Sequence, residues 1–369
     1  MSKYEERLNR VRSAVALETV DKIPYMSSGP AAHAAFANVP LADYLADMEL
    51  NCSVNLKLCT ELDVDGTQAP IFSPEMFPMM WYSEAKVPGA DLASNELWQV
   101  HEKEVMTQED YDLIKEHGYG EWQANFLMKH FDNPFQKLAP YFSYYPEALR
   151  RFKEGGIPSF VDAAFESPFE AICGARSLSV FLADDLMEIP EKVEEVFNII
   201  HAHNMVGHRA MLENPETRPL GVWIGGWRGT PSMLSKPMFE KYSWRYMREL
   251  GELCIEYGVI PIFHLDSDWT LGLESFKEIQ PKKGILALDG KTDIFKAKEI
   301  LGDHMCIMGD VPAELLAFGK EEAVYNYSMK LIKEIGPTGY ILCTGCDTPF
   351  NAKFENVLMM KKARDDYKG

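Results

Sequence analysis

Residues 259–267 read VIPIFHLDS, an apolar run that ends in polar residues. Short runs of β-branched and aromatic residues that stop at Gly, Asp, Ser or Pro indicate β-strands. The preceding residues 235–258, SKPMFEKYSWRYMRELGELCIEYG, carry apolar side chains at spacings of three and four and end in glycine, which predicts a helix. A helix followed directly by a strand is the repeating unit of an alternating α/β fold.

The same strand pattern occurs at eight places along the chain. Besides residues 259–267, it covers 22–28, 64–68, 156–165, 219–226, 284–290, 304–311 and 339–346. A second helix candidate, EEAVYNYSMKLIKEIG at 321–336, stands before the last of these strands. Eight strands with helical crossovers predict an α/β fold of the (β/α)8 TIM barrel type. The alternative is an open doubly wound sheet, but its GxGxxG fingerprint is absent after the first strand.

The connection between the second and third strands, residues 69–155, is far longer than an ordinary βα crossover. We expect this insertion to form a lid or pocket wall for an apolar, flat substrate. The alternative is that most of its aromatic residues form a small satellite core. With no repeat or low-complexity linker, residues 1–369 are expected to form one domain. The aromatic residues of the insertion are Phe72, Phe77, Trp81, Tyr82, Trp98, Tyr119, Trp122, Phe126, Phe131, Phe135, Tyr141, Phe142, Tyr144 and Tyr145.

Charge and composition narrow the class of protein. The chain has 37 basic and 56 acidic residues and a formal net charge of −19, which argues against binding to nucleic acid or to an anionic membrane surface. The first twenty residues lack the apolar core of a signal peptide, and no stretch approaches about 20 uninterrupted apolar residues. We therefore expect a cytoplasmic protein whose 7 cysteines are reduced.

Polar residues gather at the predicted strand ends, where the βα loops of a TIM barrel build the active site. His264 and Asp266 end the fifth strand, Asp289 the sixth, Asp310 the seventh, and Cys346 the eighth. Side chains at i and i+2 of a strand point to the same side, so His264 and Asp266 can converge on one point. Imidazole, carboxylate and thiolate with a fourth position open make up a catalytic zinc site. His264, Asp266 and Cys346 are therefore candidate metal ligands.

The eighth strand also carries a second thiol, because residues 340–349 read YILCTGCDTP. Cys343 and Cys346 differ by an odd step, so along one strand they face opposite ways, and one of them should be packing. A thioredoxin-type redox pair is disfavoured, since that motif places its first thiol at a helix N-terminus. The alternative remains that both cysteines are buried and bind nothing.

These motifs together resemble a known family. The strand ending in His-x-ligand, the GDVP at 309–312, the Gly-Cys-Asp at 345–347 before Pro349, and the opening RLNRVRSAVALETVDKIPY are similar to the uroporphyrinogen decarboxylase superfamily, specifically its cobalamin-dependent methyltransferase branch. The resemblance implies a TIM barrel with zinc on His264, Asp266 and Cys346. Asp266 stands where thiol-methylating members have cysteine. Decarboxylases carry arginine after the first strand, whereas residues 26–51 contain neither arginine nor lysine.

The resemblance implies a zinc-dependent methyltransferase that moves a methyl group from a methoxylated substrate to the cob(I)alamin of a partner corrinoid protein. The aromatic-rich insertion favours an aromatic substrate. The chain lacks the DxHxxG cobalamin-binding motif, so the corrinoid would arrive on that partner. One alternative is a methylcobalamin:thiol methyltransferase of the coenzyme M type. Another is a metal-free barrel that acts as a binding subunit. The oligomeric state is left open, with a homodimer among the expectations.

Five further residues are candidates for the site. Asp310 is expected to orient His264 or to transfer a proton, and Asp289 has the same but weaker claim; the alternative for Asp310 is a helix cap. Trp227 is expected to stack on a substrate ring, and Arg228 to pair a carboxylate such as that of a methoxybenzoate, unless it lies on the surface. Glu166 follows the third strand, where the site opens; the alternative is a solvated glutamate.

Overall fold

The computed structural model of the protein describes residues 1–368. Six parallel strands form one sheet in the order β10-β9-β8-β7-β6-β5. A parallel pair, β1 and β2, forms a second small sheet. The bounds of these strands are Met26–Ser27 for β1, Gly66–Thr67 for β2, Ala163–Ala164 for β5, Gly221–Gly226 for β6, Ile260–Leu265 for β7, Ile285–Leu288 for β8, Cys306–Val311 for β9 and Tyr340–Thr344 for β10.

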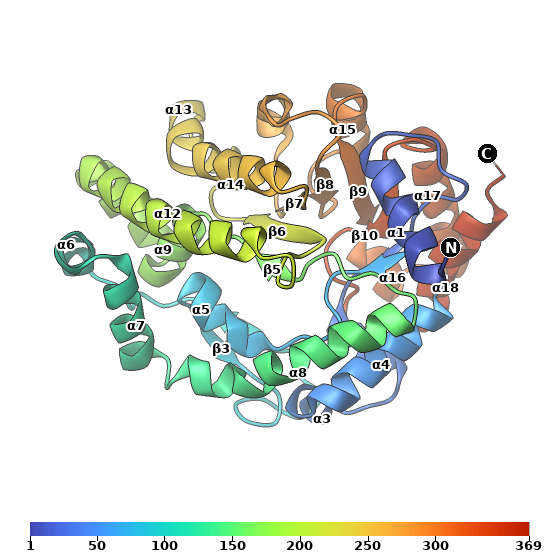
Figure 1. The fold of residues 1–369 in the computed structure, drawn as a ribbon, viewed down its shortest axis with the longest axis horizontal. Coiled ribbons are helices and arrows are strands. Elements are labelled where there is room, and N and C mark those ends of the chain that lie inside the picture. The colour runs from blue at the N-terminus through green and yellow to red at the C-terminus, as the bar shows by residue number, and fades with distance from the viewer. Residues whose placement is uncertain (369) are drawn as a thin grey trace.

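Two single parallel bridges join the small sheet to the large one and close the barrel. Tyr25, just before β1, pairs with Leu342 of β10, and Thr67 of β2 pairs with Ser159 in the segment that leads into β5. Each of the eight predicted strand segments contributes one strand or bridge segment to the barrel wall. The predicted (β/α)8 barrel is therefore confirmed (Figure 1).

The barrel interior is a packed core at the end where the strands begin. Inward-facing side chains such as Ile262, Ala287, Met308 and Ile341 form one cluster, and the apolar face of α1 (Lys3–Val15) closes it from below. This helix starts with a capping box between Ser2 and Glu5, which satisfies backbone N–H groups of its first turn. With the lower end sealed, the open end lies where the strands finish.

Helices follow the strands around the outside of the barrel (Figure 1). The predicted helix at 235–258 is present as a continuous helical run that ends in α14, and the predicted helix at 321–336 is α17. The bounds are α2 (Pro30–Phe36), α3 (Leu41–Ala46), α4 (Met48–Glu61), α9 (Pro168–Arg176), α10 (Leu178–Val180), α11 (Leu186–Glu188), α12 (Pro190–Glu213), α13 (Lys236–Met238), α14 (Arg245–Glu256), α15 (Ile294–Leu301), α16 (Ala313–Phe318), α17 (Glu321–Glu334) and α18 (Phe354–Asp366).

Residues 69–155 fold into helices and one antiparallel hairpin. The hairpin consists of β3 (Glu84–Lys86) and β4 (Gln99–His101); the helices are α5 (Phe77–Trp81), α6 (Gln108–His117), α7 (Tyr119–His130) and α8 (Pro134–Glu154). Figure 1 shows α8 running beside α4, while α6 and α7 pack on α12. Tyr119, Trp122, Phe126 and Phe131 are buried in the main core of the protein. Among residues 1–368, no helix combines the length and the apolar character that crossing a membrane requires.

Candidate metal centre

The strand β7 positions the first two candidate ligands. His264 lies at a buried position of β7, between Gly225 of β6 and Ala287 of β8 in the register of the sheet. It follows the inward-facing Ile260 and Ile262 at the strand period of two, so it continues the inner face at the open end. Asp266 lies just beyond the strand, with its backbone N–H donated to the Gly226 carbonyl at 3.0 Å.

The loop after β10 brings the third candidate ligand. β10 ends at Thr344, two residues short of the predicted 346, so Cys346 lies on the loop, exposed to solvent, rather than on the strand. Gly345 is required here, since a Cβ at this position would lie 2.5 Å from the Asp289 carbonyl oxygen. Cys343, by contrast, is 2% exposed and packs inside the barrel. The two thiols of the CxxC motif therefore have different environments.

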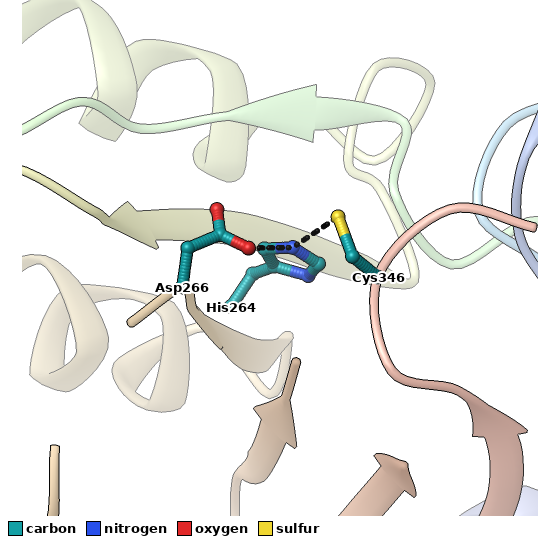
Figure 2. A group of neighbouring side chains, drawn as sticks. All are labelled: His264, Asp266 and Cys346. Carbon is teal, nitrogen blue, oxygen red and sulfur yellow. Dashed lines mark hydrogen bonds and ion pairs between the residues drawn. The ribbon is translucent and has the colours of Figure 1, made fainter. Parts of the chain in front are cut away.

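The three side chains converge at the mouth of the barrel (Figure 2). His264 Nε2 lies 3.5 Å from Asp266 Oδ1 and 3.6 Å from Cys346 Sγ, and all three donor atoms lie within 4.8 Å of one another. Zinc–ligand bonds of about 2.0–2.3 Å in a tetrahedron put the donor atoms about 3.3–3.8 Å apart. The donor types and the two distances from His264 fit Zn²⁺.

Electrostatics couple the three groups. Burial of the His264 imidazole disfavours its charged form, but the adjacent Asp266 carboxylate and Cys346 thiol outweigh burial and raise the pKa of His264 well above its ordinary value. Burial likewise works to raise the pKa of Asp266, and the imidazole reverses that effect and lowers it. A metal cation at this place would compete with the proton on His264, because metal ligation requires the neutral imidazole.

Asp289 and Asp310 lie at the ends of neighbouring strands as predicted, and both are held by other groups. Asp289 accepts hydrogen bonds from the backbone N–H groups of Ser267 and Lys291, each at 2.8 Å, and so fixes the loop that follows Asp266. Asp310 accepts one from the Tyr327 hydroxyl at 2.8 Å, and burial raises its pKa to about 7. Their predicted catalytic roles stay predictions.

Arg228 faces the protein interior, where its guanidinium has partners. It is 2% exposed, so surface placement is wrong. Its Nε and Nη2 donate to Glu102 Oε2 at 3.0 and 2.8 Å, and its guanidinium lies 3.7 Å from the centre of the Trp227 ring. Glu170 accepts hydrogen bonds from the backbone N–H groups of residues 227–229. The loop after β6 is therefore tied to its surroundings on both sides.

Two tryptophans beside the metal centre were not predicted as site residues. The Trp223 ring centre lies 5.8 Å from that of His264, and Trp223 covers Gly225, where a Cβ would meet the indole at 2.0 Å. Trp81 from the insertion contacts Trp223 and Trp227, with ring centres 6.3 and 5.3 Å apart. Trp223 could have been predicted from the sequence, because alternate side chains of a strand face the same side and Trp223 is at an inward-facing position of β6. Trp81 could not, because its approach depends on tertiary folding.

The comparisons with known proteins agree with this architecture. Residues 153–367 match the family model described as uroporphyrinogen decarboxylase (URO-D), and the chain belongs to that family. A methyltransferase from Methanosarcina mazei has the same fold, with a TM-score of 0.72 and 16% sequence identity over 98% of each chain. A zinc-bound IOLI protein matches with a TM-score of 0.34 and 16% identity over 71% of this chain and 93% of that chain, too weakly to support an inference. None of the curated proteins matches the chain.

Proposed function

We propose that the protein is a zinc-dependent methyltransferase that moves a methyl group from a methoxylated aromatic substrate to the cob(I)alamin of a partner corrinoid protein. The observation that carries the proposal is the convergence of His264, Asp266 and Cys346 at the open end of the barrel. Membership of the URO-D family and the fold shared with a methyltransferase support it.

This reaction requires that the protein stabilise the leaving oxygen and hold the substrate in a fixed orientation. His264, Asp266 and Cys346 would hold a Zn²⁺ ion, which would supply Lewis-acid stabilisation to the oxygen that loses its methyl group. Asp289 fixes the loop next to Asp266 through the Ser267 N–H. The Trp223 ring lies beside the imidazole, with the ring centres 5.8 Å apart, and would border the bound substrate on that side.

The aromatic preference rests on the wall beside the metal centre. Trp223, Trp81 and Phe77 follow one another in ring contact, with Phe77 stacked on Trp81 at 4.9 Å. Flat apolar faces of this kind suit an arene ring. Because Phe77 and Trp81 come from residues 69–155, the insertion serves as the pocket wall of the proposed site. The methyl acceptor, a corrinoid held by a separate protein, would approach from the solvent side.

Two other functions of the same barrel fit less well. A methylcobalamin:thiol methyltransferase would be expected to carry cysteine at position 266, which is occupied by Asp266. Decarboxylation of a porphyrinogen calls for cations at the mouth, yet residues 26–51 hold neither arginine nor lysine. This segment borders the mouth, since Ser28 donates a hydrogen bond to Asp347 at 2.7 Å, next to Cys346.

The test has two stages. Elemental analysis after aerobic, chelator-free purification should find stoichiometric zinc, and substoichiometric zinc would favour the metal-free binding subunit. The zinc-loaded protein is then mixed with a carrier protein in the cob(I)alamin state and a set of methoxyarenes. We expect the cobalt spectrum to report methylation with the wild-type protein and not with Cys346→Ala. Methyl transfer only from methylcobalamin to a thiol would reject demethylation.

A further inference from the structure

A group of buried polar atoms without partners lies beside the aromatic wall. Among residues 1–368, ten buried side-chain nitrogen or oxygen atoms have no hydrogen-bond partner, and five of them belong to Trp81, Glu166, Ser167 and Trp227. The five atoms are Trp81 Nε1, Glu166 Oε1, Glu166 Oε2, Ser167 Oγ and Trp227 Nε1. An unpaired buried polar group costs about 1–3 kcal/mol, so such a concentration points to a partner that the free chain lacks.

These residues come together from three elements at the mouth of the barrel. Glu166 and Ser167 follow β5, Trp227 follows the adjacent β6, and Trp81 ends α5 of the insertion. The rings of Trp81 and Trp227 are 5.3 Å apart. The Trp81 indole N–H lies near enough to Glu166 to lower its pKa as a hydrogen-bond donor, but the two groups do not reach hydrogen-bond geometry, so both remain without a partner. Trp223 is in ring contact with both Trp81 and His264, so a single indole separates this group from the metal centre.

The charges around the group disfavour an anion. Burial, and then the neighbouring Glu170 carboxylate, raise the pKa of Glu166 well above its ordinary value. Glu170 is itself 1% exposed. The one nearby cation, Arg228, already donates to Glu102 and stacks on Trp227. A substrate carboxylate entering here would meet two acidic side chains and no free positive charge, contrary to the expectation that Arg228 pairs a methoxybenzoate.

Counting donors and acceptors identifies the ligand group. The two indole N–H groups can only donate, whereas the Glu166 carboxyl, kept neutral by its raised pKa, donates through its O–H and accepts at its other oxygen. An ammonium only donates, so it leaves both indole N–H groups unpaired. A carboxylate could accept from the group, but it would bury its negative charge without a free cation. A hydroxyl does both: its oxygen accepts from an indole N–H while its proton goes to a Glu166 oxygen. An uncharged hydroxyl therefore matches Trp81, Trp227 and Glu166 together.

We propose that Trp81, Glu166 and Trp227 form a specificity subsite that binds the ring hydroxyl of a methoxyphenol while its methoxy group faces the metal centre. This inference rests on the proposed function, because it names the substrate class of the same site. The ring of the substrate lies along Trp223, between the hydroxyl and the metal-binding imidazole. Methoxyarenes without a hydroxyl, or with a carboxylate, bind poorly.

Binding to the zinc-loaded protein, measured by calorimetry without any carrier, tests the subsite. The probes are 4-methoxyphenol, 1,4-dimethoxybenzene, 4-methoxybenzoate and 4-methoxybenzylamine. We expect 4-methoxyphenol to bind about 10- to 100-fold more tightly than the other three, because only it completes the buried hydrogen bonds without burying a charge. Glu166→Leu should reduce this preference to less than about threefold while the zinc content stays unchanged.

Two further variants keep the result interpretable. Trp227→Phe retains an aromatic ring and removes only the indole N–H, so it tests the subsite even where Glu166→Leu does not fold. Trp98→Phe is the matched control, because Trp98 stacks on Phe72 within the insertion and is outside the subsite. Equal binding of all four probes, or a preference untouched by both subsite variants, overturns the inference. Selective binding without methyl transfer would instead reject the proposed reaction and keep the subsite.

Discussion

Replacing each thiol of the CxxC motif by serine separates a structural role from a ligand role. Cys343 is 2% exposed among apolar side chains of the barrel interior, and burial raises its pKa to about 12. A serine there buries a hydroxyl without an assured partner, at a cost of about 1–3 kcal/mol. Cys346 is exposed on the loop after β10, so Cys346→Ser should change the stability of the metal-free protein by less than about 0.5 kcal/mol.

The same pair should behave in the opposite way toward zinc. Cys343→Ser leaves His264, Asp266 and Cys346 in place, so zinc affinity should match the wild type. Cys346→Ser replaces a thiolate by a neutral hydroxyl, which is not among the usual zinc ligands of proteins. The loss of zinc affinity should therefore exceed the roughly 10- to 100-fold expected when only a partner of a ligand is removed. The assays are urea unfolding of the metal-free proteins and zinc content after dialysis against chelator-buffered zinc.

Cys306→Ser provides a control for the stability arm. Cys306 also lies in the barrel interior, 0% exposed, on the neighbouring strand β9. Its variant should lose stability and keep zinc, as Cys343→Ser does. Equal zinc loss from Cys343→Ser and Cys346→Ser would refute the assignment of the two thiols. Full zinc affinity in Cys346→Ser would refute the metal centre itself.

Three more perturbations test parts of the structure away from the thiols. Burial lowers the pKa of His208 to about 4, below the value of about 6.5 for a free imidazole. The unfolded chain therefore binds the proton more readily as the pH falls below 6.5, and the folded protein should lose up to about 2 kcal/mol of stability by pH 5. His208→Phe keeps the ring stack on Phe165, so it should lose less stability than the wild type between pH 7 and 5 in urea unfolding, and an equal loss contradicts this. Asp289→Ala releases the Ser267 N–H and should weaken zinc binding about 10- to 100-fold in competition with a chelator; unchanged affinity would mean that the loop is held by other contacts. Gly345→Ala, whose Cβ would meet the Asp289 carbonyl at 2.5 Å, should destabilise the protein by about 1–3 kcal/mol in thermal unfolding, and an unshifted midpoint would contradict the close approach.

The barrel and the candidate metal centre follow from patterns that are local in the sequence. Each strand is a short apolar run with its own stop signal, and the period of two places His264 on the inward face together with Ile260 and Ile262. The fold class then puts every strand end at the same opening. Cys346 could be predicted for the same reason, although it lies past the end of its strand, because the end of β10 is fixed near the end of β7 by barrel closure.

The surroundings of the site could not be predicted, because they depend on contacts between residues far apart in the chain. Arg228 looks like a free cation in the sequence, and only the folded insertion brings Glu102 against it. Glu166 follows a strand and would ordinarily be solvated, and the approach of Trp81 buries its carboxyl. Both outcomes come from the 69–155 insertion, whose path over the barrel no local periodicity specifies.

The shape of the barrel interior explains why the two ligand-bearing segments can meet. Strands β7 and β10 are separated in the sheet by β8 and β9, so His264 and Cys346 must approach across the opening rather than along the sheet. Gly345 makes this approach feasible, because it lets the loop after β10 pass against the Asp289 carbonyl. Trp223 then fills the side of the opening next to β6. The opposite side is bordered by Trp81, Glu166 and Trp227, where the donors and acceptors without partners are found, and this is the side on which the proposed substrate would bind.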